Sequence, residues 1–195
     1  IAVTDDSSLA DRYEVIKNQS GSLTAFNVIY EKDKLVVVHE RGTMEGLYRV
    51  EWDGYPDQIG DSIDLAVCEG ASGIVLAGHI GKLIKGAGGI MNTHSHQADA
   101  RMEILTAYAA VAGADGETLR LVMKAVTTDA GMEILQRCGL LSETMQLILG
   151  KIQAHVQKRA GSRVETGIII FSNVYGLLGQ TENVPTMLAE LAGKT

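Results

Sequence analysis

Two continuous apolar runs divide this 195-residue chain into strand-like and helix-like segments. Residues 74–77 read Ile-Val-Leu-Ala and residues 166–171 read Thr-Gly-Ile-Ile-Ile-Phe, without regular alternation. Runs of this kind are typical of parallel strands that are buried on both faces. Elsewhere apolar residues recur at three- and four-residue intervals, which indicates amphipathic helices. The helical spacing covers residues 59–67, most of the chain from residue 97 onward, 145–156 and 184–192.

These elements predict an α/β fold class, with mostly helical layers around a parallel or mixed sheet and a β-rich amino-terminal portion. Three early segments are strand-like, the first two separated by a turn of hairpin length: residues 23–30, 35–39 and 47–52. We therefore divide the chain into a β-rich portion, residues 1–56, and an α/β domain, residues 57–195. Because the first residue is Ile1 and not Met, we expect the natural amino terminus to extend further.

Polar residues follow both buried strands. Gly-His-Ile-Gly-Lys occupies positions 78–82, and Ser-Asn-Val-Tyr-Gly occupies positions 172–176. Ligands of open α/β sheets bind at the carboxyl ends of the strands. If the two strands are parallel, His79 and Asn173 emerge at the same edge, and this edge is the candidate active site.

The region from His79 to His96 holds three of the chain's five histidines within 18 residues. Small residues surround His79, so the backbone could approach a ligand there, and its imidazole could serve as a general base near neutral pH. Thr128 is the predicted amino-terminal cap of a helix that ends near Cys138.

Lys82 and Lys85 lie three residues apart on one predicted helix, and two interpretations of them are open. Lysines on a helix are most often a solvated flank. Beside histidines, in a chain with a net charge of −7, they could instead bind the carboxylates of an acidic ligand.

His94, His96 and Asp99 could offer two nitrogens and one oxygen to a divalent cation. The His-x-His spacing is a weak signal on a helix, so we favour histidines that face solvent or a polar ligand over a dedicated metal site.

Several function classes are disfavoured. Leu76 and Leu83 stand where a Walker phosphate loop needs Gly and Ser or Thr, which argues against a small phosphate-binding hydrolase. The acidic balance argues against a nucleic-acid partner, and no apolar run reaches the roughly 18 residues of a membrane helix. Two cysteines without disulfide or metal spacing, and no secretion signal, favour a reduced, cytoplasmic protein.

The segments Gly-His-Ile-Gly-Lys-Leu-Ile-Lys at 78–85 and Ala-Gly-Gly-Ile-Met-Asn-Thr-His-Ser at 87–95 resemble the CbiD family of cobalamin biosynthesis. Ile-Gly-Asp at 59–61 and Ala-Asp-Ala-Arg-Met-Glu at 98–103 are similar to that family as well, so the resemblance covers about residues 57–191. CbiD proteins are longer, and their Thr-Gly-Thr-Cys-Ala-Ala-like and Gly-Ile-Ser-Ile-Leu-Gly-like segments are not found here.

The resemblance implies an S-adenosylmethionine-dependent C-methyltransferase that acts on C1 of a cobalt-containing corrin precursor. It implies a small-molecule tetrapyrrole substrate that carries the cobalt, and helix faces rich in alanine and methionine leave room for a homodimer. The alternative function is a non-catalytic tetrapyrrole- or metal-binding protein.

Residue chemistry, and not the resemblance, assigns the candidate roles. His79 and His94 are the candidate catalytic residues. The candidate substrate-binding residues are polar or basic neighbours in the same region and at the second strand end: Lys82, Lys85, Thr93, Ser95, His96 and Asn173. Gly78 and Gly81 are the candidate cofactor-binding residues, and no residue is assigned to a metal.

Overall fold

The computed structural model describes residues 22–23, 26–29, 35–39, 42–43, 59–68, 71–93 and 98–192. The predicted third strand at 47–52, and His94, Ser95 and His96, lie outside the described residues. The division of the chain at residue 56 also stays a prediction.

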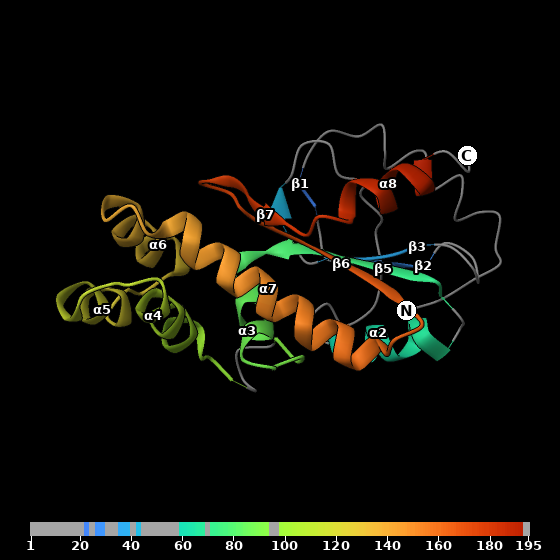
Figure 1. Ribbon diagram of the computed structural model, residues 1–195, viewed down its shortest axis with the longest axis horizontal. Coiled ribbons are helices and arrows are strands. Elements are labelled where there is room, and N and C mark those ends of the chain that lie inside the picture. Colours follow the sequence, from blue (N-terminus) through green and yellow to red (C-terminus); the bar gives the residue numbers. More distant parts are fainter. Residues whose placement is uncertain are drawn as a thin grey trace.

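Figure 1 shows helices packed around one central sheet. The strands are β1 Ser22–Leu23, β2 Phe26–Ile29, β3 Leu35–His39, β4 Gly42–Thr43, β5 Gly73–His79, β6 Glu165–Ser172 and β7 Gly176–Gln180. The helices are α2 Ile59–Cys68, α3 Ile80–Ala87, α4 Arg101–Val111, α5 Gly116–Met123, α6 Thr128–Arg137, α7 Leu141–Ala160 and α8 Val184–Ala192. The predicted α/β fold class is confirmed.

The sheet is mixed, with the strand order β2-β3-β5-β6-β7. Its three inner strands, β3, β5 and β6, run parallel, and β2 and β7 join the two edges antiparallel. Strands β5 and β6 are the two apolar runs of the sequence, and both are buried almost throughout. The continuous pattern therefore indicated their parallel, doubly covered position correctly.

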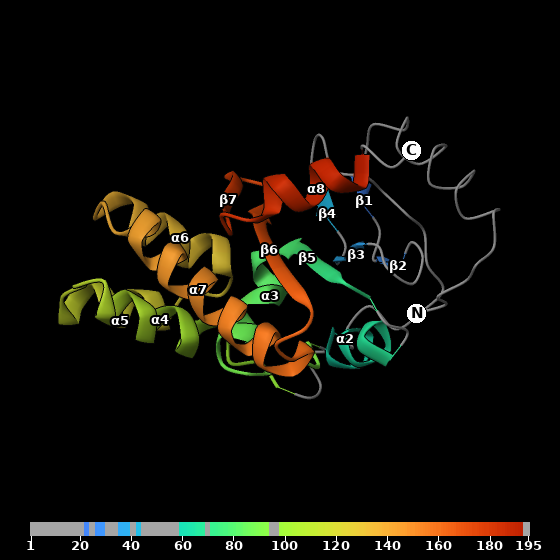
Figure 2. The same cartoon turned by 45° about the vertical axis from the view of Figure 1, so that its right-hand side comes forward.

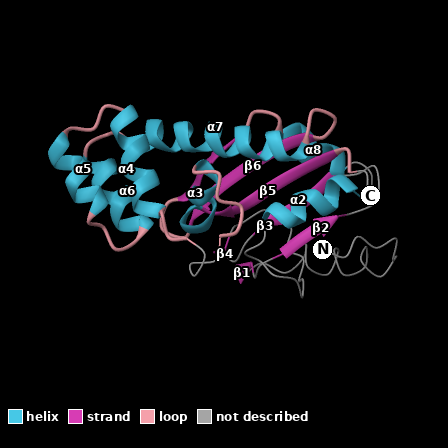
Figure 3. Cartoon of the chain, turned by 90° about the horizontal axis from the view of Figure 1, so that it is seen from below, coloured by secondary structure: helices cyan, strands magenta, loops and turns pink. Residues whose placement is uncertain are grey.

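Helices cover both faces of this sheet. Figures 1 and 3 show α8 on one face and α2, α3 and α7 on the other. In Figure 2, α4, α5 and α6 form a separate helical group at one end of the molecule, and the long helix α7 runs from that group across the sheet. Apolar residues of α3, α7, β5 and β6 belong to one continuous core. No helix in the described ranges is long and apolar enough to cross a bilayer.

The register between β5 and β6 positions the candidate site. His79, the last residue of β5, lies opposite Phe171, the penultimate residue of β6. Ser172 and Asn173 therefore leave the sheet at the edge where His79 leaves it, as the sequence predicted. This is the edge on which the helical group α4–α6 lies (Figure 1).

One local prediction was wrong, and one strand was missed. Thr127, and not Thr128, caps α6: its hydroxyl accepts from the Ala130 backbone N–H at 3.1 Å, and Thr128 is buried in the first turn. Strand β7 was not predicted, because residues 176–180 read Gly-Leu-Leu-Gly-Gln, a short glycine-containing segment without alternation that pairs with β6.

Candidate active site at the carboxyl edge of strands β5 and β6

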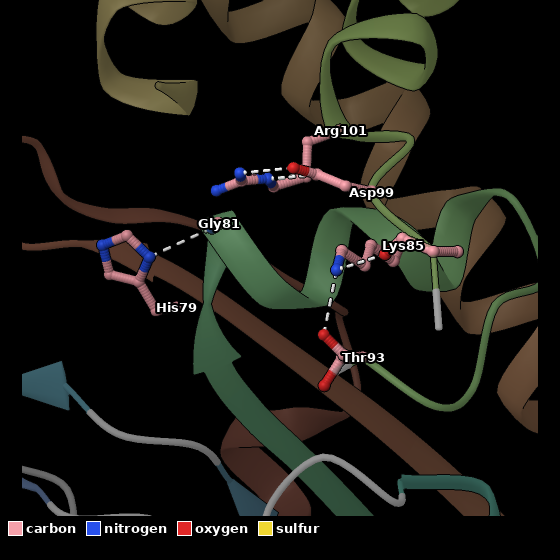
Figure 4. Close-up of polar contacts among 7 residues, drawn as sticks. His79, Gly81, Lys85, Thr93, Asp99 and Arg101 are labelled. Atoms are coloured by element: carbon pink, nitrogen blue, oxygen red, sulfur yellow. Dashed lines mark hydrogen bonds and ion pairs between the residues drawn. The ribbon is translucent and has the colours of Figure 1, made fainter. Parts of the chain in front are cut away.

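His79 is both the end of β5 and the amino-terminal cap of α3, so no connecting loop separates the strand from the helix. Its backbone is extended (φ −67°, ψ 134°), and its Nδ1 accepts from the Gly81 backbone N–H at 3.0 Å (Figure 4). The helix begins directly at Ile80. Because Nδ1 accepts, the neutral imidazole carries its proton on Nε2.

The imidazole is half-buried, and an aromatic ring lies against it. The ring of Phe171 meets His79 edge to face, with centroids 5.8 Å apart and an interplanar angle of 87°. Burial lowers the pKa of His79 from its ordinary value of 6.5, and the negative charge of Asp129 opposes that shift. His79 is therefore a mostly neutral imidazole at neutral pH, which is the state that a general base requires.

Asp129 and Ser172 were missed by the sequence reasoning. Asp129 lies in the first turn of α6, and its Oδ1 accepts from the Ser172 hydroxyl at 2.9 Å. The same hydroxyl oxygen accepts from the backbone N–H groups of Val174 and Tyr175, at 3.0 and 3.3 Å. These bonds hold the amino end of α6 against the end of β6, so a carboxylate stands near His79. The sequence signal that could have drawn attention to Asp129 is its place in the first turn of a helix, where a negative charge interacts favourably with the helix dipole.

We expect the His79 imidazole to titrate below pH 6.5 when followed by NMR, and Asp129→Asn to lower its midpoint further. The substitution removes the charge that favours the protonated form. Glu133→Gln is the matched control, because Glu133 lies on the same helix but pairs with Arg137 in solvent. A midpoint at or above 6.5, or one that Asp129→Asn leaves in place, would contradict this description.

The same pKa shift makes stability depend on pH. Between pH 6.5 and the lower native pKa, the unfolded chain binds more protons at this position than the folded chain. The contribution of His79 to stability is therefore complete above about pH 6.5 and is lost as the pH falls through that window. His79→Gln is expected to flatten this part of the curve of unfolding free energy against pH.

The two lysines of α3 have different environments. Lys82 is half-buried in the first turn, whereas Lys85 is only 1% exposed and is among the largest fully buried side chains. The Lys85 ammonium donates to the carbonyl oxygens of Thr93 at 2.9 Å and of Ala98 at 2.7 Å (Figure 4). The sequence left a solvated and a ligand-binding interpretation open for Lys85. The structure shows a buried cation instead, because the chain returns over α3 and places the Thr93 and Ala98 carbonyls against it.

Residues just beyond that contact form a charged pair. Arg101 Nε and Nη2 donate to the two oxygens of Asp99, at 2.6 and 2.8 Å. Hydrogen bonds from Arg101 are the main reason that the pKa of Asp99 is lowered, and the charge of Lys85 contributes in the same direction. Asp99, which the sequence offered as a metal ligand, is therefore paired with a guanidinium. Among the described residues, no group of three His, Cys, Asp or Glu side chains is arranged to hold a metal ion.

The two glycines assigned to a cofactor do not leave open space. A Cβ placed on Gly78 would lie 2.9 Å from Cγ of Leu83, so this glycine lets α3 pack closely against β5. A Cβ on Gly81 would lie 3.1 Å from Nδ1 of His79 and 3.3 Å from Oγ1 of Thr128. Both glycines therefore let the protein's own side chains pack closely against the backbone, and whether they also contact a cofactor stays a prediction.

The structure brings only part of the predicted set together. His79, Lys82, Lys85 and Thr93 lie on or against α3, and Asn173 is exposed just past β6. Thr93 is fully buried and contributes its carbonyl oxygen to Lys85. Whether these residues meet a substrate stays a prediction.

Residues 92–182 match the family model described as CbiD, C-terminal domain. The resemblance to the CbiD family is confirmed. His79, Lys82 and Lys85 precede the range that the CbiD model matches, whereas Asp129, Ser172 and Asn173 lie within it, so the site joins residues from both parts of the chain. No solved structure matches the chain significantly.

Curated relatives carry the name cobalt-precorrin-5B C(1)-methyltransferase. The protein from Ruminiclostridium cellulolyticum is 43% identical over 116 residues, which cover 60% of this chain and 30% of the relative. The protein from a Thermoanaerobacter species is 35% identical over 70% of this chain and 37% of its own length. The protein from Salmonella arizonae is 47% identical over 54% of this chain and 26% of its own length. This chain thus matches about a third of the length of these CbiD-type relatives.

Proposed function

We propose that this chain forms part of an S-adenosylmethionine-dependent C-methyltransferase that acts on C1 of cobalt-precorrin-5B, a cobalt-containing corrin precursor of anaerobic cobalamin biosynthesis. The observation that carries the proposal is the similarity to relatives named for this reaction, at 35–47% identity. The match to the carboxyl-terminal CbiD domain agrees with it.

His79 is the described residue best suited to move a proton in such a reaction. Its pKa is lowered by burial, its Nδ1 is held by the Gly81 N–H, and its proton is therefore on Nε2. The substrate of this reaction is a macrocycle rimmed with carboxylates. Lys82, in the first turn of α3, has a positive charge that suits these carboxylates. Since methyl transfer depends mainly on alignment of donor and acceptor, residues that orient the ring contribute to the rate as directly as a proton carrier.

S-adenosylmethionine would supply a methyl group activated by a sulfonium. Leu83, His79 and Thr128 lie where side chains at Gly78 and Gly81 would stand, so these two glycines could meet the donor only through their backbone. A contact of the donor with Gly78 or Gly81 stays a prediction from the sequence. The cytoplasmic location and the homodimer remain predictions from the sequence.

Calorimetric titration of the full-length protein with S-adenosylhomocysteine tests the proposal. Saturable binding, together with methylation of cobalt-precorrin-5B, is expected. Binding of the tetrapyrrole without binding of S-adenosylhomocysteine would favour a non-catalytic tetrapyrrole-binding protein.

His79→Ala is expected to lower kcat by about 100-fold, the lower end of the contribution of a positioned acid or base. His155→Ala is the matched control: this histidine is also half-buried, but it lies beside Gly89 and outside the candidate site. The kcat of His155→Ala should stay within a few-fold of that of the parent protein. Equal rates for the parent and His79→Ala would remove His79 from the mechanism.

A further inference from the structure

The buried ammonium of Lys85 joins parts of the chain that are separated in the sequence. It reaches from the last turn of α3 to the carbonyl oxygens of Thr93 and Ala98, which lie 8 and 13 residues further along. These two residues flank positions 94–97, which include three of the predicted site residues. One charged group thus holds the backbone on both sides of that segment.

An ammonium is chemically suited to this contact. It carries three donors and no acceptor, so carbonyl oxygens can surround it much as they surround a monovalent cation. Charge-assisted hydrogen bonds of 2.7–2.9 Å are the stronger class of such bonds. Without the ammonium, the buried Thr93 carbonyl would lose this donor.

The main chain of Lys85 supports the same region. Its carbonyl oxygen accepts from the backbone N–H groups of Gly88 at 2.9 Å and of Ile90 at 3.0 Å, which closes the end of α3. Gly89 takes the left-handed conformation (φ 77°) that this turn requires. The Gly60 N–H of α2 donates to the carbonyl oxygen of Met91 at 3.2 Å, which also fixes the segment that follows α3.

Lys85, whose ammonium anchors the Thr93 and Ala98 carbonyls, lies on the same short helix that His79 caps. His79 caps the amino end of the helix, and Lys85 lies within two turns of it. Figure 4 shows Lys85 and Thr93 together beside α3, with the Asp99–Arg101 pair following in the same region. The position of Thr93 and Ala98 relative to His79 is therefore fixed through one helix and one ammonium.

We propose that Lys85 is a positioning residue, whose ammonium sets the place of the chain on both sides of residues 94–97 relative to His79, and that it does not itself bind the substrate. This inference rests on the proposed function. With 1% of the residue exposed and its ammonium donating to two backbone carbonyls, Lys85 is not available to a carboxylate of the substrate. Of the two candidate lysines, Lys82 then remains the one predicted to contact the substrate.

The experiment compares Lys85→Ala and Lys85→Met in the full-length protein. Alanine removes the ammonium and leaves the volume of propylammonium, whereas methionine removes the charge and fills most of the space. Both variants are expected to lose about 100-fold in kcat/KM for cobalt-precorrin-5B while still folded at the assay temperature, the effect of displacing a group by about 1 Å. Propylammonium should restore part of the activity of Lys85→Ala and none of that of Lys85→Met, and propan-1-ol should restore neither.

Hydrogen exchange of the backbone amides provides a readout that does not depend on methylation. Peptides that cover residues 93–98 should exchange faster in both variants, and peptides from β6 and α7 should not. If the parent protein does not methylate the substrate, the proposed function fails. Hydrogen exchange at residues 93–98 then still tests whether Lys85 positions this part of the chain. Unchanged exchange at residues 93–98, or a kcat/KM of Lys85→Met equal to that of the parent, overturns the inference.

Discussion

Phe171→Ala is expected to lower the free energy of unfolding by about 4 kcal/mol, the typical cost of deleting a buried phenylalanine ring. Phe171 is fully buried near the end of β6, beside the pairing with β5 and β7. The loss has two parts: transfer of the ring out of the core, and the edge-to-face contact with His79, which contributes roughly 1 kcal/mol. Urea denaturation of the parent and the variant measures the difference.

Leu177→Ala is the matched control for this substitution. Leu177 lies opposite Phe171 in the antiparallel register between β6 and β7, but 53% of it is exposed. Its replacement should change the free energy by no more than about 0.5 kcal/mol. A loss of less than about 1 kcal/mol for Phe171→Ala would mean that the ring is not part of a packed core.

The same variant changes the chemistry of the site. Removing the ring lets water approach the imidazole, so desolvation lowers the pKa of His79 less. The NMR titration midpoint of His79 should therefore rise toward 6.5 in Phe171→Ala and stay in place in Leu177→Ala. A midpoint that falls would show that the ring does not exclude water from His79.

Lys85→Met is expected to be the second most destabilising change, with a loss of about 3 kcal/mol. The buried carbonyl oxygen of Thr93 and the partly buried one of Ala98 lose the ammonium donor, and an unpaired buried group costs about 1–3 kcal/mol. The methionine avoids the cost of burying a charge, and this gain makes the net loss smaller than the cost of the two unpaired carbonyls alone. Thermal and urea unfolding measure the loss.

Lys151→Met is the control for this second prediction. Lys151 lies on α7 and is exposed, so the substitution should change stability by no more than about 0.5 kcal/mol. Equal stability of Lys85→Met and Lys151→Met would mean that the two hydrogen bonds of Lys85 contribute nothing net to folding.

Local patterns were sufficient for the main architecture. The apolar runs at 74–77 and 166–171 predicted two buried parallel strands, and both strands are parallel neighbours in the sheet. The stop at Cys138 and Gly139 was also read correctly, because a glycine in the left-handed conformation is a local requirement of the helix end. Strand β7 escaped prediction because its residues depend on β6 for their pairing and carry no pattern of their own.

The site divides in the same way. That His79 and Asn173 leave the sheet at one edge followed from the sequence, because the carboxyl ends of parallel strands meet there. The carboxylate of Asp129 joined them through a hydrogen bond to Ser172, a residue 43 positions away, and no spacing rule connects two such positions.

By itself, the sequence determined the α/β class, the two buried strands at residues 74–77 and 166–171, and the edge at which their polar ends emerge. Only the tertiary structure decided that Lys85 is buried while Lys82, one turn earlier on the same helix, is half-buried. Helical spacing gives both lysines the same local preference. The difference arises because the chain returns over one of them and offers the carbonyls of Thr93 and Ala98, and such a contact depends on distance in space and not on distance along the chain.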